Sequence, residues 1–486
     1  MIGQDDSPYY LNGAFDEYIE YLLHSGRINI SHHLNQPFTV KQLFEALRKD
    51  SLLQQESMAV LLMKDLNRYL PQDAGKGKLL LGLDLSPSLK SSFGEMTSDD
   101  FRGTTSIGYS YKNLIAYSAY TADTEYLNDT LLFGSVGKLL NQNFARTSTS
   151  YLRYDSDHFR LFYGRLDRNF GLLNTTSLIM SDNPFSYDHF SFQWFNKVFK
   201  YSFSAARLDD KFAFDSRDSI PEPAWHRRFY TFHRLDLSLS DNLKMALTET
   251  ILYGGESQQV VPAFFNPMNI FFLSKASDRK GLEEGNANAL GSLEVYYKRK
   301  KLAFFAQFLV DDMDFTKALR KEFPDRIGFL SRVILTDLVS KSQMKFGYEI
   351  VSNWTYNSFY TYGNYTFNGS SLGFPVNGFE GLIISYDYYG IDKFLLSADI
   401  GINRRRNQNL EVPFTGVKSE FPIGTAQKQA EAKFKIRYLP KVNLSIEMNL
   451  GYERIRNYLN KTGNSTNFLN ASLTATYIGL LNQILK

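Results

Sequence analysis

The chain has 486 residues, 43% of them hydrophobic, and a net charge of +3, so its length suits several soluble domains or one large membrane barrel. Its mean hydropathy is negative and it has no apolar stretch of about 18 residues, which excludes a helical membrane protein. The near balance of charge, with no basic run, argues against nucleic acid as a partner, and the absence of cysteine excludes a disulfide framework. Acidic and polar residues follow Met1 in place of a secretory signal, so we expect a mature chain without its leader.

The first part of the chain, up to residue 74, has the spacing of short helices. Apolar residues recur from Phe15 to Leu23 at the intervals that place them on one face of a helix. One glycine stop and two capping boxes delimit the predicted helices: Gly26, Thr39 with Gln42, and Ser51 with Gln54. We therefore predict a small N-terminal α-helical domain over residues 1–74.

From Lys78 onward, apolar and polar residues alternate with the period of a β-strand, and this alternation recurs as far as Tyr477. Aromatic residues make up 15% of the chain, which is typical of the aromatic girdles of outer-membrane barrels. Allowing roughly 20 to 25 residues for each strand and its connection gives about 16 to 20 strands, and bacterial barrels favour even numbers. We predict an all-β membrane barrel of about 18 antiparallel strands over residues 75–486.

Residues 428–453 show the alternation most clearly, because two strands with opposite faces flank a short turn at Pro440. Apolar side chains share one face of the first strand, and Lys433, Lys435 and Arg437 share the other. A cation on a lipid-facing position costs about 2 to 4 kcal/mol at the midplane of the bilayer. These three cations are therefore predicted to face the lumen, opposite Glu447, in a charge network that holds loops or braces the wall.

Long connections between the predicted strands are expected to be extracellular, as they are in other outer-membrane barrels. They fall at residues 166–187, 208–225, 254–287, 312–325, 353–378 and 405–426. Barrel chains usually end on an aromatic residue, but this one continues from Tyr477 to Lys486. The last strand is thus either shifted towards residues 478–486 or carries an atypical closing signal.

The stretch from Phe162 to Phe195 reads FYGRLDRNFGLLNTTSLIMSDNPFSYDHFSFQWF. Its G-R pair, its glycine-containing loop and its S-D-N-P-F segment resemble the capsule assembly (Wzi-type) family of outer-membrane proteins. Two further segments, residues 18–47 and the run PAFFNPMNIFF at 262–272, are similar to the helical head and a later loop of that family. The resemblance covers residues from about 10 to 310.

The resemblance implies a barrel that is plugged by folded loops, carries a periplasmic helical head and holds exported capsular polysaccharide at the outer surface without catalysis. It implies an outer-membrane location, contact with membrane lipid, and neither cofactor nor metal; we expect a monomer. Polar and aromatic side chains of the resembling stretch suit sugar recognition, and arginine suits an acidic sugar. The candidate polysaccharide-binding residues are Arg165, Arg168, Asn174, Asp182, Asn183 and Tyr187.

Three alternatives remain at this point. The two arginines also suit structural ion pairs with Asp167 or Asp182, and S-D-N-P also suits a turn. The barrel as a whole also suits a channel of the porin or oligosaccharide-uptake class, in which the lumen cations select anions. It also suits a structural subunit that the helical head recruits to other envelope proteins. An enzyme is not expected, because the sequence contains no G-x-S-x-G motif and no preferred Ser-His-Asp trio.

Overall fold

The computed structural model describes residues 7–70, 76–92, 98–124, 145–214, 223–273, 287–312, 324–406, 409–415, 421–422 and 424–485. The helices are η1 Gly13–Phe15, α1 Asp16–Ser25, α2 Val40–Arg48, η2 Leu53–Gln55, α3 Ser57–Asn67, α5 Pro262–Phe265, η5 Thr361–Gly363 and η6 Tyr458–Asn460. None of the helices in these ranges is long and apolar enough to cross a membrane. The predicted boundary between residues 74 and 75, and most of the predicted loop at 312–325, lie outside the described residues.

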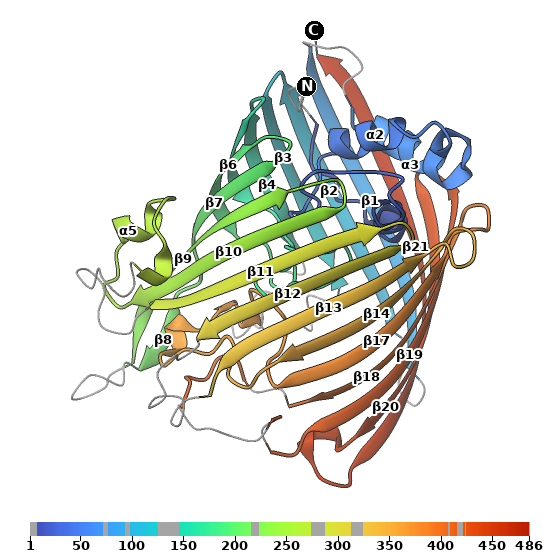
Figure 1. Ribbon diagram of the computed structural model, residues 1–486. Coiled ribbons are helices and arrows are strands. Elements are labelled where there is room, and N and C mark those ends of the chain that lie inside the picture. Colours follow the sequence, from blue (N-terminus) through green and yellow to red (C-terminus); the bar gives the residue numbers. More distant parts are fainter. Residues whose placement is uncertain are drawn as a thin grey trace.

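The strands follow one another around a barrel (Figure 1). Their bounds are β1 Gly77–Ser92, β2 Ser98–Tyr111, β3 Leu114–Asp123, β4 Ala145–Asp155, β5 Phe159–Arg165, β6 Asp188–Phe195, β7 Phe199–Arg207, β8 Lys211–Phe214, β9 Pro223–Ser238, β10 Leu243–Gly255, β11 Ala287–Arg299, β12 Leu302–Asp312, β13 Arg326–Thr336, β14 Ser342–Val351, β15 Thr366–Phe367, β16 Ser370–Ser371, β17 Phe379–Tyr388, β18 Phe394–Arg405, β19 Gln427–Lys441, β20 Leu444–Arg456 and β21 Ser465–Leu485.

Within the described residues, eighteen of these strands form one closed antiparallel barrel, which confirms the predicted fold. The other three are β8, which pairs only with β9, and the small hairpin of β15 and β16. The barrel closes where β1 pairs with β21, from Gly77 opposite Leu485 to Ser92 opposite Asn470. The last strand therefore includes both Tyr477 and the residues that follow it, and both are needed for closure.

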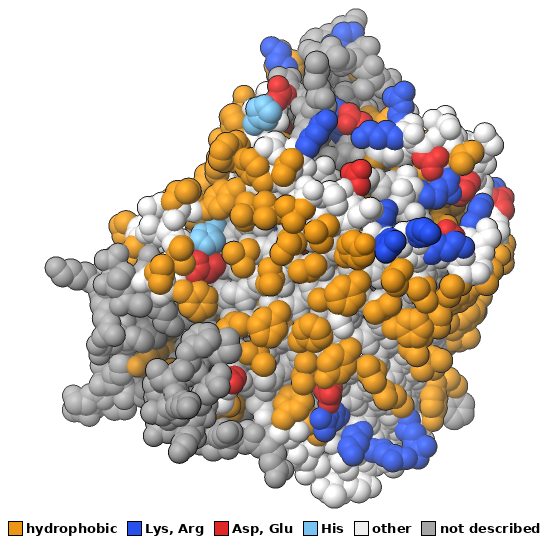
Figure 2. All heavy atoms as spheres, in the orientation of Figure 1, with side chains coloured by type: hydrophobic (Ala, Val, Ile, Leu, Met, Phe, Trp, Pro, Cys, Tyr) orange, Lys and Arg blue, Asp and Glu red, His pale blue; other side chains and the backbone are white. Residues whose placement is uncertain are grey.

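The outer wall is apolar between two polar ends. Figure 2 shows hydrophobic side chains spread over the strands of this face, with Lys and Arg gathered above and below them. Outward side chains such as Leu247, Ile400 and Leu481 are 59%, 63% and 62% exposed. The alternation in the sequence thus marks a surface that lipid covers.

The head, residues 7–70, begins and ends its helices largely as predicted. Thr39 and Gln42 form the capping box that opens α2, and Gly26 ends α1 in the left-handed conformation with φ of 76°. The second capping box is wrong, because α3 begins only at Ser57. Leu53 is fully buried in the head core, and the chain there forms the short helix η2 instead of a first α-helical turn.

The head lies in the mouth of the barrel, at the end where both chain termini lie (Figure 1). Its apolar core includes three side chains of the wall: Tyr389, which follows β17, Leu395 at the start of β18 and Leu439 near the end of β19. Hydrogen bonds also join the head to the wall all around this mouth. With the head residue first, the pairs are Arg68 and Ile478, Tyr21 and Asp337, Asn35 and Ser202, Ser7 and Arg153, and His24 and Tyr296. The head therefore closes this end of the lumen.

Two loops fold into the lumen from the opposite side and form a dry core with the wall. We call residues 166–187 the plug loop and residues 352–378 the second loop. Their buried side chains are Phe170, Leu172, Leu178, Ile179, Met180, Tyr356, Tyr365, Leu372 and Phe374. They pack against inward side chains of β9 to β13, namely Tyr230, Phe232, Leu290, Phe305, Leu330 and Ile334. This half of the lumen is filled by an apolar core, in which each buried large side chain contributes about 1.5 to 3 kcal/mol.

The segment that contains α5 lies against the outer face of the wall (Figure 1). Leu247 of β10 is exposed on this face. Phe264 and Phe271 pack on Ile251 of β10 and its neighbours. Glu249 accepts hydrogen bonds from the backbone N–H groups of Phe271 and Phe272, at 2.9 and 2.6 Å, so a carboxylate on the outer face is covered.

Candidate functional site

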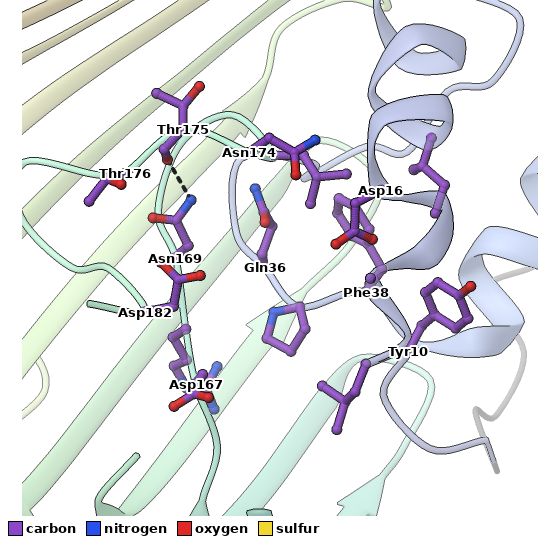
Figure 3. A pocket seen from close by; sticks show the side chains of 16 residues that line it. Tyr10, Asp16, Gln36, Phe38, Asp167, Asn169, Asn174, Thr175, Thr176 and Asp182 are labelled. Carbon is purple, nitrogen blue, oxygen red and sulfur yellow. Dashed lines mark hydrogen bonds between the residues drawn. The ribbon is translucent and has the colours of Figure 1, made fainter. Parts of the chain in front are cut away.

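A cavity of about 520 Å³ lies inside the barrel between the head and the plug loop. Figure 3 shows Tyr10, Asp16, Gln36 and Phe38 of the head on one side, and polar side chains of the plug loop on the other. Those of the plug loop are Asp167, Asn169, Asn174, Thr175, Thr176 and Asp182. Carboxylates, amides and hydroxyls thus converge from two segments that are far apart in the sequence.

The plug loop is held in one conformation by its own hydrogen bonds and by the wall. Asn169 donates to the carbonyl oxygens of Leu172 and Thr175, at 3.1 and 2.9 Å, and accepts from the N–H of Ser177 at 3.1 Å. Gln307 of β12 accepts from the N–H of Leu178 at 2.7 Å. The polar groups of the cavity are therefore preorganised, which lowers the entropy lost when a ligand binds.

Three of the six predicted site residues line this cavity: Arg168, Asn174 and Asp182. Asn174 and Asp182 are exposed to it, and Asn174 also donates to Glu20 of α1 at 3.2 Å. Arg168 is 7% exposed and its Nε bonds to Nε2 of His189 at 3.0 Å. Its guanidinium lies 5.1 Å from the ring centre of Phe162, so most of the side chain is committed to the wall.

The other three predicted residues bind neighbouring segments. Arg165 forms a bidentate ion pair with Asp188, the residue opposite it on β6. Asn183 donates to the carbonyl oxygen of Ser371 in the second loop at 2.9 Å. Tyr187 packs against the lumen core beside Phe367.

Sequence reasoning missed Asp16 and Gln36, because they come from the head and reach the cavity only through the tertiary fold. The sequence suggested Asp167 only as an ion-pair partner for arginine, but the side chain of Asp167 is exposed to the cavity. Asn169 was also missed, although its place in the predicted loop and its capacity to bond its own backbone were visible in the sequence.

Enclosure within the lumen raises the pKa of Asp167 to about 7; Asp182 adds to the shift, and Arg146 and Arg102 oppose it. Burial likewise raises the pKa of Asp16 to about 7, with Glu17 adding to the shift and Arg437 opposing it. Burial also raises the pKa of Asp182. The cavity therefore holds carboxyl groups that take up protons near neutral pH.

These shifts predict that Asp16 and Asp167 contribute a stabilisation that grows as the pH falls from about 7 towards 3.8. Asp16 and Asp167 keep their protons up to about pH 7 when folded, but only up to about 3.8 when unfolded. Between these values the folded state binds more protons at these two groups, so their contribution to the free energy of unfolding rises as the pH falls.

His32 and His33, whose pKa values burial lowers to about 4 and about 3, oppose this stabilisation below about pH 6.5. Glu17 affects the free energy of unfolding only below about pH 4.5. Burial raises its pKa, but Arg437 and Lys435 lower it by more.

The midpoint of thermal unfolding in detergent, measured from about pH 8 to about pH 5, checks this expectation. The double substitution Asp16→Asn and Asp167→Asn should raise the midpoint more at the higher pH than at the lower pH, and so change the slope of the dependence. Asp210→Asn, which alters only an exposed ion pair with Arg207, should leave the slope unchanged. An equally steep slope in the double variant would contradict the assignment.

The predicted lumen charges lie beside this site and fasten the head. Lys435 and Arg437 of β19 both bind Glu17 of α1, and Arg437 also binds Glu447 at 2.6 Å. Lys433 pairs with Glu431 on its own strand at 3.0 Å. The network therefore joins α1 to the wall beside the cavity.

The chemistry of the site is that of recognition. Its aspartates, amides and hydroxyls accept and donate hydrogen bonds as sugar hydroxyls require, and Tyr10 and Phe38 supply aromatic surface. Among the described residues, no group of three or more His, Asp or Glu side chains is arranged to hold a metal ion.

Comparison with known proteins gives a consistent result. The family model described as capsule assembly protein Wzi matches residues 74–469. The solved structure of Wzi from Escherichia coli, described as a carbohydrate-binding β-barrel involved in group 1 capsule assembly, has 13% sequence identity and a TM-score of 0.66, covering 97% of this chain and 99% of that chain. Pseudomonas aeruginosa OccD3 (OpdP) has 11% identity and a TM-score of 0.50, covering 85% of this chain and 96% of that chain.

A search of curated protein sequences gives no significant match. At these identities, the likeness to solved structures shows the outer-membrane barrel fold. The family model matches most of the chain, from β1 to β21, and so shows more than the fold. The chain belongs to the family of Wzi capsule assembly proteins.

Proposed function

We propose that this outer-membrane barrel binds capsular polysaccharide in the cavity between the head and the plug loop, and so supports capsule assembly and surface attachment without catalytic turnover. The observation that carries the proposal is the convergence of Asp167, Asn174 and Asp182 on Asp16 and Gln36 across a cavity of about 520 Å³. A cavity of this size is in the range of sites that enclose small organic ligands. The description of the Escherichia coli protein as a carbohydrate-binding barrel supports the same function.

The charge of the cavity favours neutral sugar units at this site. Three carboxyl groups, on Asp16, Asp167 and Asp182, line it. A carboxylate accepts hydrogen bonds from sugar hydroxyls, but it repels the carboxylate of an acidic sugar. Arg165, which was expected to bind such a carboxylate, is held by Asp188. Arg168 lines the cavity, but it is 7% exposed and its Nε bonds to His189.

The head, over residues 1–74, belongs in this proposal to the periplasmic side. Outer-membrane barrels have short periplasmic turns and longer extracellular loops. The head packs on Tyr389, between the closely spaced strands β17 and β18, whereas the plug loop and the second loop enter from the other end. The cavity is then reached from the extracellular side, and the head forms its floor.

Binding of purified capsular polysaccharide by the purified barrel tests the proposal. Replacing both Asp167 and Asp182 by alanine removes two carboxyl groups that can hydrogen-bond to sugar hydroxyls, and should weaken binding by at least about tenfold. Asp210→Ala, at an exposed ion pair outside the cavity, is the matched control and should bind normally. Unchanged binding by a folded double variant would contradict this location for the site.

A further inference from the structure

A second cavity, of about 590 Å³, lies at the head end of the barrel between α2 and strands β5 to β7. Only Pro37 and Phe38 line both cavities, so the two are neighbours with different linings. The second cavity has the opposite charge. Lys49, Lys197, Lys200 and Arg160 line it, against the single carboxylate of Glu45.

The neighbouring carboxylates of the wall neutralise only part of this charge. Asp155 is shared between Arg160 and Arg153, and Asp236 is bound by Arg234 and by Asn35, each at 2.8 Å. In the part of the chain that the structure describes, none of the three lysines makes an ion pair or a side-chain hydrogen bond. Arg234 also binds Glu294, so Asp236 partly balances the charge of Lys200, the residue opposite it on β7. Lys49 and Lys197 are the cations of the cavity that this network does not balance.

Two buried amide side chains line the same cavity, and within the described residues their oxygens accept no hydrogen bond. Asn35 and Gln193 are 3% and 2% exposed, yet Oδ1 of Asn35 and Oε1 of Gln193 have no hydrogen-bond partner within the described residues. The orientation of the Asn35 amide is fixed, because its nitrogen donates to Asp236 and Ser202. Buried acceptors of this kind are satisfied by a donor such as water or the hydroxyl of a bound ligand.

We propose that this lysine cavity binds an acidic saccharide, whose carboxylate lies among Lys49, Lys197 and Lys200 and whose hydroxyls donate to Asn35 and Gln193. A simple anion satisfies the lysines but brings no donors for the amides, and a neutral sugar leaves the lysines unpaired. A sugar that carries a carboxylate supplies both. The proposal concerns a separate site and does not depend on the carboxylate-lined cavity.

Calorimetric titration of the full-length protein in detergent with a galacturonate trisaccharide tests it. Maltotriose serves as the neutral sugar, and sulfate, which carries no hydrogen-bond donor, serves as the simple anion. The galacturonate trisaccharide should bind at least about tenfold more tightly than either. Lys200→Gln and Gln193→Leu should each weaken its binding by a similar factor, and Lys64→Gln, on the exposed side of α3, should not.

A double variant at the cavity rim, Lys49→Gln with Lys197→Gln, loses two exposed charges without disturbing the wall, and should also lose affinity for the galacturonate trisaccharide. Asp167→Asn should bind it normally, which separates this site from the first. Equal affinity for sulfate would overturn the assignment of a saccharide, and equal affinity for maltotriose would overturn the role of the lysines. Normal binding by folded Lys200→Gln and Gln193→Leu variants would overturn the location.

Discussion

Replacement of Arg234 by methionine is expected to destabilise the folded barrel by about 3 to 5 kcal/mol, the cost of leaving a buried charge without its partner. Arg234 on β9 is 0% exposed and donates to both carboxylate oxygens of Glu294 on β11, at 2.6 and 2.8 Å. It also bonds to Asp236 and to the carbonyl oxygen of Leu34 in the head, and lies over the ring of Phe170 in the plug loop. One guanidinium thus joins the wall, the head and the plug.

The temperature at which the folded barrel loses its faster migration on a gel measures this effect. Arg207→Met is the matched control, since Arg207 is 58% exposed in an ion pair with Asp210 and its loss should cost no more than about 0.5 kcal/mol. Adding Glu294→Leu to Arg234→Met should restore part of the stability, because it removes the stranded carboxylate. Equal transitions for the Arg234 and Arg207 variants would contradict the role given to Arg234.

The intact protein is expected to show no steady ion conductance in planar bilayers, although eighteen strands suffice for an aqueous channel. The head contacts strands on all sides of one mouth, and the two loops form an apolar core within the lumen. Glu17→Lys should produce conducting events, because it places a third cation against Lys435 and Arg437 and so repels α1 from β19.

Lys64→Glu, also in the head but on the exposed side of α3, reverses a charge without touching the wall and should stay silent. Steady conductance of the unaltered protein at the level of an open porin would contradict closure by the head. It would favour the channel interpretation that the sequence left open.

The barrel could be predicted from the sequence because lipid on one side of each strand enforces an alternation that is visible residue by residue. Lys433, Lys435 and Arg437 were placed in the lumen by the cost of a cation in lipid, and the structure has Lys435 and Arg437 beside α1. Their partner Glu17 could not be foreseen, because it lies in the head, more than 400 residues earlier in the sequence. Thr39 and Gln42 form the predicted capping box. The chain after Ser51 instead forms the short helix η2, in which Leu53 is buried.

Some residues that line the candidate cavity could be identified from the sequence, for a similar reason. Asn174 and Asp182 lie in a single loop whose polar composition pointed to sugar recognition. Asp16 and Gln36 reach the cavity only when the head enters the barrel, and the dry core around Phe170 has no signature of its own in the sequence. Contacts between segments that are distant in the sequence were therefore the part that local patterns could not supply.

The most direct test of the central claim is the amount of polysaccharide retained on cells and shed into the medium by a deletion strain, with and without the gene restored. Shedding with normal total synthesis, corrected by the unaltered gene but not by the Asp167→Ala and Asp182→Ala double variant, is the predicted result. A capsule that stays fully attached in the deletion strain would contradict the claim that this barrel holds polysaccharide at the cell surface.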